Sequence, residues 1–246
     1  METVHVKFGT SQYPPPPTPL SFVGMAATDS LFLYSVRAPR NWDEAANTGT
    51  QVARARICEA MAHLVAERGY AAVTVADVVS SVRISRRTFY EHFEDKESCF
   101  LETYRIGCEN GIAQIDEALR ALEDPDWRTR LRVSLETYVS ILAAEPHFAR
   151  VLLIDVLGAG PRALAMRERV LADYVAHYRG LRELARAEEP DLPAVPDEFL
   201  RALVGGIAEL VQQVLLESKP KDIPVRLHGL TDTLVSFAEA VLTSGG

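Results

Sequence analysis

The sequence has little cysteine and no long uninterrupted apolar run. Its 246 residues include three cysteines, Cys58, Cys99 and Cys108, none of which has the CxxC spacing of a metal site. An odd, small number of cysteines is typical of a reduced cytoplasmic protein and not of a disulfide framework. No stretch approaches the roughly 18 uncharged apolar residues of a membrane span, and the N-terminal residues lack the plan of a secretory signal. We therefore expect neither an integral membrane protein nor a secreted one.

The sequence also lacks an excess of positive charge, since its net charge is −8. The distribution is uneven: residues 51–92 have six basic and four acidic residues, whereas residues 93–246 have 17 basic and 26 acidic residues. This asymmetry would suit a small nucleic-acid-binding head on a body that repels nucleic acid. Ordinary solvated surface charge produces differences of the same size, so the pattern by itself is weak evidence.

The first 49 residues differ from the rest. Pro14–Pro17 and Pro19 favour an extended polyproline II segment, and the apolar residues that follow have no long helical period. We expect a mobile leader over 1–49. The alternatives are a PxxP-type ligand for an aromatic groove and a true start at Met25.

From about Thr50 the pattern is helical throughout. Apolar residues recur at three- and four-residue spacing between clusters of glycine and proline, without alternating strands or an internal repeat. We expect an all-α protein of about nine helices, three within 50–93 and six within 95–243. Pro125, Pro146 and Pro161 each suit the first turn of a helix.

Residues 50–95 predict two short helices joined by a tight turn, preceded by a longer one. Gly69 suits a left-handed cap after the first helix, and Thr74 with Asp77 suits a capping box for the second. Ser85 suits the N-cap of the third, and Asp95 caps the helix that follows. The expected ranges are 50–68, 75–81 and 86–92. The residues expected on their inner faces are Ile57, Met61, Leu64, Val65, Val75, Val78, Val79, Phe89 and Phe93.

This layout is that of a helix-turn-helix, in which a short second helix enters the major groove and its first turn meets base edges. Arg86 and Arg87 can contact phosphate or guanine, and Thr88 can meet a thymine methyl group. Tyr90 can reach a backbone phosphate. The alternative is an ordinary surface helix with solvated arginines.

An ordered set of residues makes the first interpretation more specific. The set comprises Arg56-Ile57, Gly69-Tyr70, Thr74, Ser85, Thr88-Phe89-Tyr90, His92-Phe93 and Lys96-Glu97. With this set, residues 54–101 resemble the DNA-binding domain of the TetR family of bacterial transcriptional regulators. The resemblance covers about a fifth of the chain.

The resemblance implies which residues contact double-stranded DNA. Arg86 and Arg87 are the candidates for reading bases, and Tyr90, His92 and Lys96 those for phosphate. Arg56 would contact phosphate or form a salt bridge. Arg83 stands where the family usually has Gly or Asn; in a left-handed conformation it costs on the order of 1 kcal/mol more than Gly, which a phosphate contact could offset. The full expected set is Arg56, Thr74, Arg83, Ser85, Arg86, Arg87, Thr88, Tyr90, His92 and Lys96.

The resemblance further implies that residues 95–246 form a helical bundle that dimerises and binds a small molecule of unknown identity. Two amphipathic helices expected at 197–217 and 225–242 suit a four-helix dimer interface, and Gly205-Gly206 suits a close helix approach. The alternative is that both helices complete the monomer's own core. The expected interface residues are Leu203, Ile207, Leu210, Val214, Leu230, Leu234 and Phe237.

Candidates for the ligand site combine an apolar body with a polar handle, although core packing is the simpler interpretation of each. They are Tyr104, Cys108, Tyr138, Phe148, Leu152, Tyr174, His177 and Tyr178. His177 with Asp173 is too small a set for a metal, and no phosphate loop, GxSxG or HExxH motif is present, so we expect no metal or cofactor.

The sequence therefore predicts an N-terminal helix-turn-helix domain at 50–94 followed by a helical bundle at 95–246. The expected function is a cytoplasmic, homodimeric regulator and not an enzyme. We expect a repressor that a small effector releases from a pseudo-palindromic operator. The alternatives are a helical enzyme and a co-regulator that has lost specific DNA binding.

Overall fold

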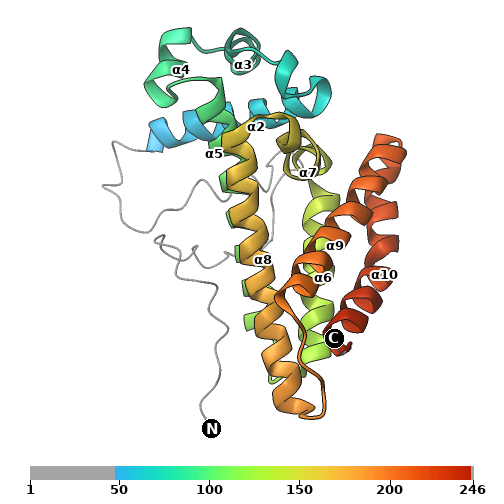
Figure 1. Cartoon of the computed structure of the whole chain (residues 1–246). Coiled ribbons are helices and arrows are strands. Elements are labelled where there is room, and N and C mark those ends of the chain that lie inside the picture. The colour runs from blue at the N-terminus through green and yellow to red at the C-terminus, as the bar shows by residue number, and fades with distance from the viewer. Residues whose placement is uncertain (1–47, 245–246) are drawn as a thin grey trace. The chain divides into compact units, whose positions relative to one another are not determined.

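The computed structural model describes residues 48–244, which contain nine α-helices, three short 3-10 helices and no strand. This confirms the expected all-α class, with three α-helices before residue 95 and six after it. The leader expected at 1–49 lies almost entirely outside the described residues. In chain order the elements are α2 (Thr48–Arg68), η1 (Tyr70–Ala72), α3 (Val75–Val82), α4 (Arg86–His92), α5 (Lys96–Arg120), α6 (Trp127–Ala144), α7 (Pro146–Leu153), η2 (Asp155–Gly158), α8 (Pro161–Glu188), α9 (Asp197–Glu217), η3 (Pro220–Asp222) and α10 (Ile223–Thr243) (Figure 1).

The helix boundaries agree closely with the capping pattern. The bounds of α4 and α9 are those expected, and α2, α3 and α10 extend the expected ranges by one or two residues at an end. Gly69 has a positive φ of 77° but a ψ of 151°, which lies outside the left-handed helical region. The expectation of a left-handed cap is therefore wrong, although the positive φ is confirmed.

The prolines mark helix starts with one exception. Pro146 and Pro161 are the first residues of α7 and α8, where the missing N–H has no intrahelical partner to lose. The expectation for Pro125 is wrong, because Asp126 is the N-cap of α6. The Asp126 carboxylate accepts a hydrogen bond from the Thr129 N–H at 2.7 Å, which places Pro125 outside the helix.

The described residues divide into two compact units. We call residues 48–113 and 147–166 the head unit, and residues 114–146 and 167–244 the body unit. The helices α5 and α8 each contribute to both. The domain boundary expected near residue 94 does not coincide with this division, and it remains a prediction about which segment binds DNA.

The head unit is built on one apolar face of α2. Ile57, Met61 and Val65, at helical spacing, have no exposed surface, and α3 packs on α2 and on α4. Phe89 of α4 and Phe100 of α5 are also fully buried. The two short helices are therefore held by side chains that they share with longer ones.

A glycine brings α7 onto α5 inside the head unit. A Cβ added at Gly107 of α5 would lie 1.3 Å from the ring carbon Cζ of Phe148 in α7. The phenyl ring thus occupies the space that any other residue at position 107 would fill. Phe148 is itself buried, so its ring has little freedom to move away.

In the body unit α10 packs against both α6 and α9 (Figure 1). A Cβ at Gly206 of α9 would lie 2.9 Å from the ring of Phe237 in α10, so this glycine permits the close helix approach expected for it. At the first residue of α6, the fully buried Trp127 donates its ring N–H to the Glu189 carboxylate at 2.9 Å.

The helix α9 is long and apolar enough, by length and composition, to cross a membrane. Its most apolar window has a mean hydropathy of 1.5, and 44% of that window is buried inside the chain. Arg201 and Glu209 interrupt the apolar residues of α9, so the helix contains no uncharged run of the length expected for a membrane span. One such helix is weak evidence for a membrane span, since the core helix of a soluble protein passes the same test.

We expect the substitution Gly107→Ala to lower the free energy of unfolding by about 1–3 kcal/mol, because the added methyl group overpacks against Phe148. Denaturant unfolding followed by circular dichroism measures this change. Gly205→Ala is the matched control: a Cβ there meets nothing within 4 Å, so helix propensity should leave stability equal or higher. Wild-type stability in Gly107→Ala would contradict the close approach of the ring.

Candidate DNA interface

The helix α4 presents its first turn to solvent. The Ser85 side chain caps it by accepting a hydrogen bond from the Thr88 N–H at 3.0 Å, and the two hydroxyl groups lie 2.9 Å apart. Ser85, Arg86 and Arg87 are exposed, whereas Phe89 on the opposite face is fully buried. The arrangement leaves the polar residues of the first turn available to an external partner.

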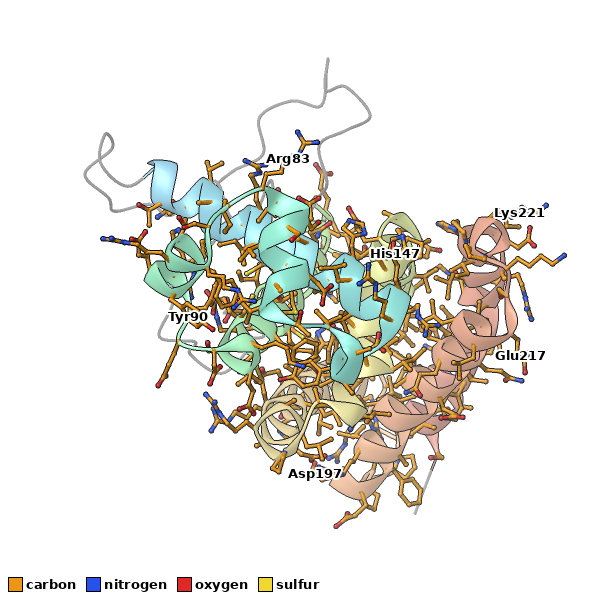
Figure 2. All side chains as sticks on the ribbon, turned by 90° about the horizontal axis from the view of Figure 1, so that it is seen from above. Arg83, Tyr90, His147, Asp197, Glu217 and Lys221 are labelled. Carbon is orange, nitrogen blue, oxygen red and sulfur yellow. The ribbon has the colours of Figure 1, made fainter. Side chains whose placement is uncertain are left out.

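Tyr90, a further expected residue on α4, is also accessible to a partner, as is the side chain of Arg87. Tyr90 is 56% exposed, and the Arg87 side chain is 90% exposed even though its Nε donates to Glu91 at 3.2 Å. Such an exposed pair one helical turn apart is weak and easily exchanged for another anion. Figure 2 shows the side chain of Tyr90 projecting away from the ribbon.

The helix α3 begins with the expected capping box. The Thr74 hydroxyl accepts from the Asp77 N–H at 3.2 Å, and the Asp77 carboxylate accepts from the Thr74 N–H at 2.9 Å. The hydrogen bonds from Thr74 lower the pKa of Asp77, so this carboxylate is ionised at neutral pH. Thr74 is exposed and could still donate to a phosphate only by giving up its hydroxyl contact with Asp77 at 2.5 Å.

The turn between α3 and α4 depends on a left-handed Arg83. Its φ and ψ are 57° and 47°, a conformation that glycine adopts without strain. The Arg83 N–H donates to the Ser80 carbonyl at 3.3 Å, and the Ile84 N–H donates to the Val79 carbonyl at 3.0 Å. The Arg83 side chain is exposed and can be followed in Figure 2.

Lys96 has a structural role that the sequence did not reveal. Its Nζ donates to the carbonyls of Tyr70 and Val73, both at 2.9 Å, and lies 4.1 Å from the centre of the Tyr70 ring. Two of the three ammonium N–H groups are thus used to hold the start of α5 against the segment before α3. The expected phosphate contact remains a prediction that the third N–H could satisfy.

His92 and Arg56 differ in their surroundings. His92 is half-buried, and burial together with the charge of Arg54 lowers its pKa, so the ring is neutral at physiological pH. Arg56 is exposed and forms no ion pair with any residue that the structure describes, which favours the phosphate interpretation over the salt bridge.

Arg54 is a charged residue that sequence reasoning missed. Its Nη1 donates to the His92 carbonyl at 2.7 Å, its Nε and Nη2 contact Glu102 Oε1 at 3.2 and 3.0 Å, and its guanidinium lies 4.4 Å from the centre of the Phe93 ring. Arg54 is three, four and seven residues before Ile57, Cys58 and Met61, and so shares their buried face. A charge on the apolar face of an amphipathic helix was a signal in the sequence that a partner would be found.

A pocket of about 270 Å³ lies beside Arg54 in the head unit. None of the eight expected ligand residues lines it. Its lining residues are Arg54, His92, Phe93, Glu94, Ser98, Leu101, Glu102, Arg162 and Met166.

The expected ligand residues fall into two groups. In the head unit Tyr104, Cys108 and Phe148 are buried and Leu152 is half-buried. In the body unit the Tyr138 and Tyr174 rings lie 6.0 Å apart, and His177 and Tyr178 are buried. Their common role in binding a ligand remains a prediction.

His177 is a buried neutral imidazole in the body unit. Its Nε2 lies 3.2 Å from the Ser134 hydroxyl, which donates its own hydrogen to the Arg130 carbonyl at 2.8 Å. Because that hydrogen is used, Nε2 must donate to Ser134. Burial lowers the pKa of His177 to about 4.

Most of the expected dimer residues belong to the chain's own core. Leu203, Ile207, Val214 and Leu234 are buried by the packing of α9 and α10 inside one chain, so a partner cannot reach them in this conformation. The helical period does not distinguish a face buried by the same chain from one buried by a second copy. The others, Leu210, Leu230 and Phe237, keep exposed surface.

The described residues contain no group of three or more His, Cys, Asp or Glu side chains placed to hold a metal ion. Cys58, Cys99 and Cys108 are buried and form no disulfide.

We expect Arg83→Gly to raise the free energy of unfolding by about 1 kcal/mol, because glycine adopts the left-handed conformation without a Cβ clash. Arg86→Gly is the control, since the same change inside the right-handed α4 should lower stability by about 1 kcal/mol. Urea unfolding of both variants measures the effects. Equal destabilisation of the two would show that the turn is not left-handed in solution.

We expect His177 to destabilise the folded chain increasingly as pH falls through the range set by its two pKa values. Its pKa is near 6.5 when unfolded and about 4 when folded, so between these values the unfolded chain binds a proton that the folded chain excludes. The contribution of His177 to stability should therefore decrease as pH falls from about 6.5 to 4, while Asp116 and Asp155, whose pKa burial raises to about 6, contribute in the opposite direction. His177→Gln should reduce this dependence in urea midpoints measured at pH 7 and pH 4.5. An unchanged pH dependence would mean that His177 is accessible to protons.

Comparison with known proteins agrees with the geometry of α3 and α4. Residues 57–103 match the family model described as bacterial regulatory proteins, tetR family. The chain is 27% identical over 202 residues to the HTH-type transcriptional repressor AcnR of Corynebacterium diphtheriae, an alignment that covers 71% of this chain and 97% of that protein.

Solved structures show the same fold. A bacterial regulatory protein in the tetR family from Rhodococcus RHA1 has a TM-score of 0.57 at 24% identity, over 74% of this chain and 96% of its own. The transcriptional regulator FadR of Bacillus subtilis, solved in complex with stearoyl-CoA, has a TM-score of 0.62 at 17% identity, over 78% of this chain and 98% of its own. Residues 57–103 thus carry the match to the tetR family, and about three quarters of the chain share the fold of solved tetR-family proteins.

Proposed function

We propose that the protein is a homodimeric repressor that binds a pseudo-palindromic operator and is released by a small-molecule effector. The observation that carries the proposal is the first turn of α4, where Ser85, Arg86 and Arg87 are exposed while Phe89 anchors the helix from behind. A helix held in this way can enter the major groove without giving up any packing.

Each exposed residue has a role in this proposal. Arg86 and Arg87 read bases, since a guanidinium can donate two parallel hydrogen bonds to guanine, and Thr88 meets a thymine methyl group. The residues proposed to contact the phosphate backbone are Arg56, Thr74, Arg83, Ser85, Tyr90, His92 and Lys96. The neutral His92 would act as a hydrogen-bond donor and not as a cation.

The dimer would form through the outer surfaces of α9 and α10. Leu210, Leu230 and Phe237 keep exposed surface there, and Phe199 and Leu216 of α9 are large exposed apolar residues. Two copies joined in this way would present two recognition helices to half-sites about one DNA turn apart, which is why the operator should be pseudo-palindromic.

The effector would act by shifting a population. It releases DNA only if it binds more tightly to the arrangement that does not fit the operator. The complex of FadR with stearoyl-CoA supports the idea that this fold can hold an organic ligand, but it does not identify the ligand of this chain. The candidates for contacting it remain the two groups around Tyr104 and His177.

The proposal assigns no catalytic activity and no cofactor, and it places the protein in the cytoplasm, where its operator is. The enzyme alternative has no specific observation in its favour. The co-regulator alternative is disfavoured by the exposed arginines of α4.

Selection of bound duplexes from random DNA, with purified protein at near-physiological salt, tests the proposal. Wild-type protein should enrich one pseudo-palindromic sequence. Arg86→Ala and Arg87→Ala should each weaken binding to that sequence by about 1–3 kcal/mol, the value of a lost bidentate base contact. Competition with mutated operators should show relaxed preference at one base pair per half-site.

Arg186→Ala is the matched control, because Arg186 is an exposed arginine of α8, outside the surfaces proposed to bind DNA or to form the dimer. It should bind the operator as the wild type does. Enrichment of no sequence by a folded dimer would overturn the proposal, and an operator affinity unchanged in both α4 variants would remove the base-reading assignment.

A further inference from the structure

The C-terminal end of α4 needs an external partner. A helix of seven residues leaves most of its carbonyls without an intrahelical N–H, and α4 ends directly at Phe93. The Phe93 N–H donates back to the Phe89 carbonyl at 2.9 Å, while the carbonyl of His92, the last residue of α4, accepts from Arg54 of α2 at 2.7 Å. The end of the recognition helix is therefore held from another helix.

The Arg54 guanidinium binds three groups at once. It donates to the His92 carbonyl, contacts the Glu102 carboxylate through Nε and Nη2, and stacks on the Phe93 ring. The guanidinium offers three nitrogens in one fixed plane to the carbonyl and the carboxylate, whereas a lysine offers a single nitrogen, so the two residues are not equivalent here. The bridge links α2, the end of α4 and α5.

Glu102 is committed to this bridge as an anion. Burial opposes its ionisation, but the hydrogen bonds and charges of Arg105 and Arg54 outweigh burial and lower its pKa. Arg105 donates to Glu102 at 2.8 and 3.0 Å and also to Glu109 at 2.5 Å. The carboxylate is only 18% exposed, compared with 35% for the Arg54 side chain.

We propose that Arg54 is a positioning residue, which fixes the end of the recognition helix α4 to Glu102 of α5 and does not contact DNA phosphate. The inference rests on the proposed DNA-binding function and adds to it a residue that sets the orientation of α4. Its positive charge is neutralised inside the protein by Glu102. Operator affinity should therefore depend on Arg54, although Arg54 should release no counterion from the DNA when the complex forms.

Two substitutions separate charge pairing from the bridge. We expect Arg54→Lys to keep a cation beside Glu102 and to lose the bond to the His92 carbonyl, because one nitrogen replaces the three of the guanidinium. Arg54→Met keeps an unbranched stem over Phe93 and loses both bonds. The adjacent pocket allows water to replace the guanidinium, so both variants should fold.

Hydrogen–deuterium exchange of the DNA-free protein is the first measurement. In both variants the amides of 86–93 should exchange about tenfold faster, the consequence expected from losing a hydrogen bond to a charged group. The thermal midpoint of Arg54→Lys should stay closer to wild type than that of Arg54→Met. Arg105→Gln, which removes the other partner of Glu102 without touching α4, should leave exchange in α4 unchanged.

DNA binding is the second measurement. Affinity for the selected operator should fall about tenfold in Arg54→Lys, with the slope of log K against log salt unchanged. Arg56→Ala provides the contrast, since loss of a real phosphate contact lowers the slope by about one unit.

Three results for Arg54→Lys would overturn the inference. The first is an exchange rate in α4 equal to that of the wild type. The others are a slope of log K against log salt that falls by about one unit, and an operator affinity equal to that of the wild type. Failure of the wild type to select any DNA would instead overturn the proposed function. The exchange measurement would still decide whether Arg54 holds α4.

Discussion

A seven-residue helix is too short to be stable by itself, and the side of α4 that we propose to face DNA has to remain unoccupied. All of its stabilisation must therefore come from its ends and from its inner face. Ser85 caps the start, Phe89 and Phe93 are buried, and Arg54 binds the carbonyl of His92. The rest of the head unit follows from this requirement, because α2 and α5 have to supply the surfaces and charges that α4 lacks.

Two cations in the head unit serve the protein's own backbone. Lys96 binds the carbonyls of Tyr70 and Val73, and Arg54 binds that of His92. Buried carbonyls are strong acceptors that must be satisfied, and a long cationic side chain can do this between segments that no regular hydrogen-bond ladder connects. The number of basic residues in the head unit therefore overstates the number of positive groups available to phosphate. The exposed Arg83, Arg86 and Arg87 are a better measure of the DNA-facing surface.

The sequence predicted the helices and the turn between α3 and α4 well, because these depend on local signals. The capping residues Thr74 and Ser85 and the period of the apolar residues are such signals. Predictions that need tertiary information were less successful. Leu203 and Leu234 have the spacing of an interface but are buried within one chain, and periodicity cannot say which surface covers a helix face. Arg54 was detectable in principle, as a charge among buried residues of α2, but its partners lie 38 and 48 residues away.

The same contacts suggest how an effector could be sensed at the recognition helix. Lys96 and Glu102 both lie on α5, which begins in the head unit and continues into the body unit. A change in α5 would act on the two cationic contacts together, since each joins α5 to a different segment of the head. An effector needs only a difference in affinity of a few kcal/mol to shift an equilibrium between two arrangements of α5. The charge-assisted hydrogen bonds of Arg54 and Lys96 together have an energy of this size. Under the proposed function, regulation through α5 would require no contact between the effector and α4, only that Arg54 and Lys96 bind their carbonyls better in one arrangement than in the other.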